Sequence, residues 1–146
     1  MQRVSAREAA ALIERGYAYL DVRTAPEFAE GHPRGAYNVP WVTPGEREMT
    51  RNPAFVQQVT AALGKEASIV VGCASGVRSL EAALHLAEHG FLHVCEQRAG
   101  MSGVRDAFGR STERGWRDEG FPVDTEPQPM RSHEEIAARA SIHSVP

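Results

Sequence analysis

The residues of this sequence best suited to chemistry lie together between positions 69 and 79. Cys73 follows the β-branched run Ile69-Val70-Val71, typical of a strand buried on both faces, and precedes an apolar pattern at helical spacing that ends near Gly90. The order strand, short loop, helix places Cys73 at a strand end, where free N–H groups at the helix start favour an anion. We therefore expect a stabilised and reactive thiolate at Cys73.

The residues after Cys73 are expected to wrap around its sulfur. Gly76 allows backbone angles that a side chain would forbid, and Arg78 brings a permanent cation with a planar donor fork to the mouth of the loop. The alternative interpretation is that Cys73 is a small buried hydrophobe and Arg78 a solvated cation. The coincidence of strand end, glycine, arginine and helix start favours the reactive thiol. The expected backbone donors to a bound anion belong to Ala74, Ser75, Gly76, Val77 and Ser79.

The spacing within the loop separates two kinds of thiol enzyme. A protein tyrosine phosphatase loop has five residues between its cysteine and arginine, because a whole phosphate must fit within the ring of donors. Here four residues separate Cys73 from Arg78, and Ser79 stands where that arginine would be. The pocket is therefore expected to suit one extra sulfur atom on Cys73, a persulfide, better than a phosphoryl group.

Several segments together resemble one known family. Residues 73–79 are similar to the active-site loop of the single-domain rhodaneses, the thiosulfate sulfurtransferases. The other matching segments are Leu20-Asp21-Val22-Arg23 with Glu27-Phe28, Gly31-His32 with Gly35-Ala36-Tyr37-Asn38-Val39-Pro40, and the glycine-containing stretch after residue 98. The resemblance covers about residues 4–124.

The resemblance implies a fold and supporting roles. The fold is α/β, a rhodanese-like three-layer domain whose parallel five-stranded sheet carries helices on both faces, with Cys73 at its carboxyl edge. Asp21 is expected to help hold the loop, and Arg23 to pair locally with Glu27, although an ordinary strand-end ion pair is an equal alternative. His32 is expected to fix its turn by hydrogen bonds rather than to act as a base.

The pattern of the chain predicts individual elements. A capping box of Ser5 and Glu8 opens a helix that ends near Gly16, and a proline-led helix begins at Pro53. Residues 41–52 are polar and are expected to form a long surface loop. Relative to the family, residues 104–115 form a charged insertion near the active-site edge. The expected strands are an edge strand at Val4 and segments 17–22, 36–39, 69–71 and 91–95.

Composition excludes several classes of partner. The chain has 146 residues and a formal charge of −3, with a pI near 6.1, so it carries no basic footprint for nucleic acid. No apolar run is long enough to cross a membrane, and the N-terminus lacks the apolar core of a signal peptide, so the expected location is the cytoplasm. Two cysteines make no disulfide framework, and a reducing compartment would keep a persulfide-forming thiol free.

Neither the second cysteine nor the histidines suggest another site. Cys95 is expected to be a buried strand residue, because nothing cationic surrounds it. His85, His89 and His93 are four apart, but Gly90 ends the helix before the third. We therefore expect no metal site, and no organic cofactor is needed if Cys73 itself carries the transferred atom.

Residues 1–124 are expected to form the rhodanese domain, and residues 125–146 a linker and tail with a short helix capped by Ser132 and Glu135. The expected reaction transfers a sulfane sulfur from thiosulfate or a similar anionic donor through a Cys73 persulfide to cyanide or a thiol acceptor, with Arg78 orienting the donor. A carrier or persulfide-sensing module that binds a protein partner is the alternative. A phosphatase or arsenate reductase is a weaker one.

Overall fold

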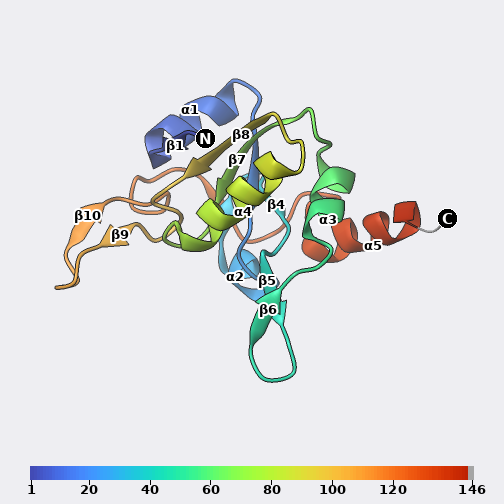
Figure 1. Cartoon of the computed structure of the whole chain (residues 1–146). Coiled ribbons are helices and arrows are strands. Elements are labelled where there is room, and N and C mark those ends of the chain that lie inside the picture. The colour runs from blue at the N-terminus through green and yellow to red at the C-terminus, as the bar shows by residue number, and fades with distance from the viewer. Residues whose placement is uncertain (145–146) are drawn as a thin grey trace.

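A five-stranded parallel sheet forms the centre of the molecule (Figure 1). The computed structural model describes residues 1–144, and the strand order is β1-β8-β7-β2-β4 with every neighbouring pair parallel. This confirms the predicted sheet. The strands are β1 (Arg3–Val4), β2 (Ala18–Asp21), β4 (Tyr37–Asn38), β7 (Ser68–Gly72) and β8 (His93–Gln97).

The first two helices begin at capping boxes. Ser5 and Glu8 form the predicted capping box of α1, and Thr24 and Glu27 form another on α2. Among residues 1–144, no helix is both long and apolar enough to span a bilayer. The helices are α1 (Ala6–Glu14), α2 (Ala25–Glu30), α3 (Phe55–Ala62), α4 (Val77–Glu88) and α5 (His133–Ser144).

The alternation of side chains along the central strand separates two apolar layers. Ile69 and Val71 face one layer, and Val70 faces the other. The first layer includes buried side chains of α3, α4 and α5, and the second includes side chains of α1 and α2 together with Trp116. Both faces of the sheet are therefore covered, which explains the apolar run Ile69 to Val71 within β7.

Within residues 1–144, three short antiparallel pairs lie outside this sheet. One joins β3 (His32–Pro33) to β11 (Val123–Asp124), one joins β5 (Val42–Pro44) to β6 (Met49–Arg51), and one joins β9 (Val104–Arg105) to β10 (Ser111–Glu113). The last two project from the body as hairpins (Figure 1).

The prediction of a plain loop over residues 41–52 is wrong. The segment forms the β5–β6 hairpin, closed by a hydrogen bond from Gly45 N to Glu48 O of 2.8 Å. Its strands are largely solvent-exposed, so no apolar alternation marks them in the sequence. Trp41, which precedes the hairpin, is buried against Phe55, and the Arg51 guanidinium lies 3.3 Å from its ring centroid.

The strand predicted at 91–95 is displaced by two residues. The observed β8 runs from His93 to Gln97, because it pairs with β7 on one side and β1 on the other. Glu96 and Gln97 are fully buried in this strand. Their polar side chains are hydrogen-bonded inside the protein, an arrangement that their residue types do not reveal.

The C-terminal helix packs on the body of the molecule. The chain folds back after β11, and α5 lies against α3 (Figure 1). Ile136 is buried in the same apolar layer as Phe55, and Ser132 caps the helix through Glu135 as predicted. The division into residues 1–124 and 125–146 remains a prediction.

Candidate active site

Cys73 follows the last residue of β7, and its sulfur faces the backbone of the loop that begins there. Cys73 Sγ accepts the N–H of Gly76 at 3.2 Å and the N–H of Ser79 at 3.3 Å. Gly76 has φ of 95° and precedes the first residue of α4, so it takes the left-handed conformation expected of it. The side chain is only 2% exposed, yet two main-chain donors converge on its sulfur. The site is therefore built to stabilise negative charge there.

The segment after β8 holds the loop from behind. Met101 N donates to Cys73 O and Ser102 N to Ala74 O, both at 2.9 Å. Gly100 has φ of 61°, and a Cβ there would collide with the carbonyls of Cys73 and Ala74. Only glycine permits this close approach, so residues 98–102 fix the position of the loop.

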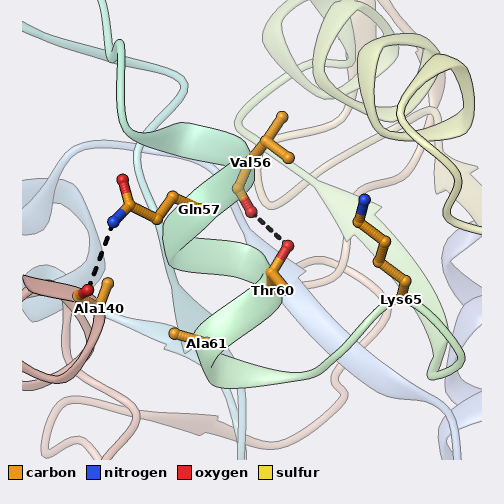
Figure 2. A pocket seen from close by; sticks show the side chains of 6 residues that line it. All are labelled: Val56, Gln57, Thr60, Ala61, Lys65 and Ala140. Carbon is orange, nitrogen blue, oxygen red and sulfur yellow. Dashed lines mark hydrogen bonds between the residues drawn. The ribbon is translucent and has the colours of Figure 1, made fainter. Parts of the chain in front are cut away.

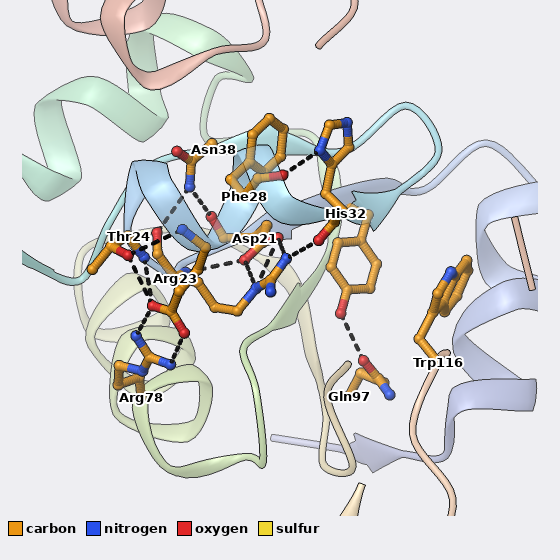
Figure 3. A network of polar contacts seen from close by, with 12 residues as sticks. Asp21, Arg23, Thr24, Phe28, His32, Asn38, Arg78, Gln97 and Trp116 are labelled. Atoms are coloured by element: carbon orange, nitrogen blue, oxygen red, sulfur yellow. Dashed lines mark hydrogen bonds and ion pairs between the residues drawn. The ribbon is translucent and has the colours of Figure 1, made fainter. Parts of the chain in front are cut away.

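Arg78 makes an ion pair at the entrance to the helix. Its guanidinium donates to both Glu27 carboxylate oxygens, at 2.7 and 3.0 Å (Figure 3). This pairing, with further hydrogen bonds from Thr24, lowers the Glu27 pKa to about 2. The same pairing raises the Arg78 pKa. The expected cation is present, but Glu27 occupies its donor fork.

The predicted pairing of Arg23 with Glu27 is wrong. Arg23 donates to both oxygens of Asp21, at 2.7 to 3.2 Å, and to Gly31 O at 2.6 Å (Figure 3). Both members of the pair are buried, and the Asp21 side chain also accepts the N–H of Arg23. A strand-end pair of this kind fixes the turn between β2 and α2, and it leaves Glu27 free for Arg78.

His32 is a buried turn residue. Its Nδ1 lies 2.8 Å from Phe28 O, and its ring stacks on the Phe28 ring with centroids 3.7 Å apart (Figure 3). The imidazole is thus packed into the turn between α2 and β3, which is the hydrogen-bonding role expected for it.

Two polar networks behind the loop are not evident from the sequence. Tyr19 Oη donates to Gln97 Oε1 at 2.6 Å, and Gln97 Nε2 donates to Gly100 O at 2.9 Å. Ser79 Oγ donates to Glu96 Oε2 at 2.5 Å, and Arg3 Nε donates to Glu96 Oε1 at 2.6 Å. Ser79 was identified from the loop, but nothing in the sequence marks Arg3, Glu96 or Gln97, because strand pairing brings them together.

A groove of about 560 Å³ borders the loop on the side of the charged insertion. Ser75, Gly76 and Val77 form one wall, and Val104 and Thr112 of the β9–β10 hairpin form another. The insertion at 104–115 therefore lies beside the cysteine-bearing loop, as expected.

A second hollow is remote from this chemistry. A pocket of about 520 Å³ is lined by α3, by Lys65 and by Ala140 of α5 (Figure 2). Its hydrogen bonds run from Thr60 Oγ1 to Val56 O and from Gln57 Nε2 to Ala140 O, so they serve the helices themselves. The second thiol, Cys95, is unsuited to act as a nucleophile. Burial, and to a smaller extent the charge of Glu96, raise the Cys95 pKa to about 11.

Comparisons with known proteins agree with this geometry. The family model for the rhodanese-like domain matches residues 5–107. Thiosulfate sulfurtransferase 16, chloroplastic, from Arabidopsis thaliana is 41% identical over 120 residues, which cover 82% of this chain and 90% of that protein. Thiosulfate sulfurtransferase 18 of the same plant is 35% identical over 125 residues, covering 84% of this chain and 83% of that protein.

A solved structure shows the same fold. The crystal structure of Rv0390 from M. tuberculosis superposes with a TM-score of 0.72 at 24% identity, covering 86% of this chain and 98% of that one. Sulfurtransferase activity is supported at the level of the family, which also includes non-catalytic members. With the cysteine loop, the sheet and the family match in agreement, this chain belongs to the rhodanese-like domain family.

Proposed function

We propose that the protein is a sulfurtransferase that carries a sulfane sulfur on Cys73. The observation that supports this most directly is the convergence of the Gly76 and Ser79 N–H groups on Cys73 Sγ. Such donors stabilise the negative charge of a thiolate and of the sulfur that it receives. The loop is short, with four residues between Cys73 and Arg78, which favours a single added sulfur over a phosphoryl group.

The proposed reaction has two balanced steps. The Cys73 thiolate attacks the outer sulfur of thiosulfate, the sulfur–sulfur bond of the donor breaks, and sulfite leaves with the bonding electron pair. Cys73 then carries a persulfide anion. Cyanide or a thiolate attacks the terminal sulfur, which leaves as thiocyanate or as a new persulfide and regenerates the Cys73 thiolate.

The family match supports a sulfur donor and acceptor in general terms, and thiosulfate is the proposed donor. The names of several plant relatives give a chloroplast location, and one gives a mitochondrial location. For this chain we propose a reducing compartment, the cytoplasm, because a persulfide-forming thiol must stay unoxidised there.

A carrier that hands its sulfur to a protein is the second candidate. Phe108 is 83% exposed at the tip of the β9–β10 hairpin, whose base borders the groove beside the loop. Exposed aromatic side chains of this kind are common at protein interfaces. Such a protein would form the persulfide but turn over small acceptors poorly.

The test is incubation with thiosulfate followed by intact mass measurement. One added sulfur atom is expected, and it should be released as thiocyanate when cyanide is added. Cys73→Ser should not gain the sulfur, whereas Cys95→Ala should gain it normally. Persulfide formation without thiocyanate would favour the carrier. Hydrolysis of an aryl phosphate or reduction of arsenate that depends on Cys73, with no added sulfur, would refute the proposal.

A further inference from the structure

A buried carboxylate lies behind the nucleophilic sulfur. Glu96 is 0% exposed on β8. Its Oε2 accepts the hydroxyl of Ser79 at 2.5 Å, and Ser79 Oγ in turn lies 3.2 Å from Cys73 Sγ. Its Oε1 accepts Arg3 Nε at 2.6 Å. A continuous hydrogen-bonded chain therefore runs from the thiol through Ser79 to Glu96 and on to Arg3.

The direction of each hydrogen bond in this chain is fixed by chemistry. An ionised carboxylate only accepts, so the single hydroxyl hydrogen of Ser79 is directed to Glu96. Ser79 Oγ is then left to accept from the S–H of Cys73. The sulfur meanwhile accepts two main-chain N–H groups, from Gly76 and from Ser79. With Glu96 ionised, the chain therefore serves a neutral thiol.

The same chain has a second arrangement of identical net charge. We propose that Cys73 and Glu96 share one proton through Ser79, so that Glu96 takes up the thiol proton when the sulfur becomes the nucleophile. The S–H bond breaks and its proton joins Ser79 Oγ, while the Ser79 hydroxyl proton passes to Glu96 Oε2. The thiolate then accepts three donors, namely two N–H groups and the Ser79 hydroxyl, and neutral Glu96 donates to Ser79.

Burial explains why this proton stays inside the protein. Cys73 is 2% exposed, so direct exchange of its proton with water is obstructed. Glu96 is 0% exposed, and its carboxylate accepts hydrogen bonds from Ser79 and Arg3, so exchange of a proton between Glu96 and water is obstructed as well. The inference rests on the proposed function, because sulfur transfer is the reaction in which the Cys73 thiolate acts as the nucleophile.

The other charged and titratable groups around the pair do not compete for the proton. Arg3 and Arg78 act on Cys73 as cations with no site to accept a proton. Burial raises the pKa of Tyr19 well above its usual value and that of Cys95 to about 11, so both stay protonated at neutral pH. Glu96 is the acceptor that the chain reaches.

The test is the pH dependence of Cys73 alkylation by iodoacetamide, with the adduct assigned to Cys73 by peptide mass. Below the pKa of an isolated thiol, the alkylation rate rises roughly tenfold for each unit increase in pH, because only the thiolate reacts. A shared proton predicts a plateau instead. In the native protein the rate should change less than about threefold between about pH 5.5 and 7, because the thiolate fraction is set inside the pair.

Two variants test the role of the hydrogen-bonded chain from Cys73 through Ser79 to Glu96. Glu96→Gln removes the acceptor, and Ser79→Ala removes the path but leaves the pair of Glu96 with Arg3 intact. Both should lose the plateau and gain the tenfold slope per pH unit, with thermal unfolding confirming the fold. A charge effect of Glu96 alone would leave Ser79→Ala like the native protein, and that result would overturn the proposal. A steep profile in the native protein would overturn it as well.

Alkylation reports the thiol whether or not sulfur is transferred. A plateau that both variants abolish, in a protein that gains no sulfur from thiosulfate, would refute the proposed function but support the shared proton. Persulfide formation in a native protein whose alkylation rate depends steeply on pH would support the proposed function but refute the shared proton.

Discussion

The pair of Arg78 and Glu27 allows the donor-binding role proposed for Arg78 to be separated from its structural role. Arg78→Ala removes the cation, and Glu27→Gln releases the cation from its partner. Arg78→Ala removes both hydrogen bonds, and Glu27→Gln removes the negative charge and one of the two accepting oxygens, so both substitutions abolish the ion pair. They should therefore have similar effects on stability but opposite effects on the use of an anionic sulfur donor.

The size of the stability effect follows from the Glu27 pKa. A fall from 4.5 to about 2 corresponds to roughly 3 kcal/mol before screening by solvent. The Glu27 side chain is 34% exposed, so we expect about 1–2 kcal/mol in practice. A double-mutant cycle on the free energy of unfolding at pH 7 should give a coupling energy of that size.

The pH dependence of this contribution has a definite sign. The folded-state pKa of Glu27 lies below its ordinary value of 4.5, so the stabilisation is fully present above 4.5 and is lost as the pH falls toward 2. The stability difference between the native protein and Glu27→Gln should therefore shrink between pH 4.5 and 2. Urea denaturation across this range measures it, and a difference that grows on acidification would contradict the assignment.

The kinetic comparison refutes or supports the donor role. Arg78→Ala should raise the KM for thiosulfate by roughly tenfold, the equivalent of about 1.4 kcal/mol, and change the KM for an uncharged organic trisulfide much less. Glu27→Gln frees the guanidinium, so its KM for thiosulfate should stay the same or fall. If both variants raise the KM for thiosulfate equally, Arg78 acts only through its ion pair and the reasoning fails.

Three further predictions test other parts of the structure. Cys73→Ser should abolish sulfur transfer and change the free energy of unfolding by less than about 1 kcal/mol, and retained transfer would refute the nucleophile. Gly100→Ala should lower the free energy of unfolding by more than about 3 kcal/mol and disturb the loop. The matched Gly109→Ala, at a glycine with φ of 78° and open space around it, should lower it by about 1–2 kcal/mol. Equal losses would show that residues 98–102 do not hold the loop in place. In chemical denaturation, Ile136→Ala should lower the free energy of unfolding by about 2–4 kcal/mol, because Ile136 is buried in the core. Ile142→Ala, at an exposed position of the same helix, should lower it by less than about 0.5 kcal/mol. Equal effects would indicate that α5 does not share the core.

Much of the architecture follows from local pattern. The apolar run before Cys73 predicts a doubly buried strand, and Gly76 indicates the left-handed turn that begins α4. These features are readable because they depend on residue type and short spacing. The β5–β6 hairpin was missed because its exposed strands carry no apolar alternation.

The partners of the charged residues required the folded chain. Arg23 stands four positions from Glu27 in sequence, yet it pairs with Asp21, and Glu27 pairs with Arg78 from a distant helix. Charge alone does not select a partner, because several carboxylates suit each arginine. Backbone geometry selects it by placing two groups within hydrogen-bonding distance.

The sequence by itself determined the cysteine-bearing loop and the strand and helix on either side, because all of them lie in one continuous stretch whose residue types and spacing dictate local conformation. Only the tertiary structure decided what stands behind the sulfur. Glu96 reaches Ser79 because parallel pairing places β8 beside β7, and Arg3 reaches Glu96 because β1 pairs with β8. Those contacts join residues up to 93 positions apart, and no local pattern in the chain records them.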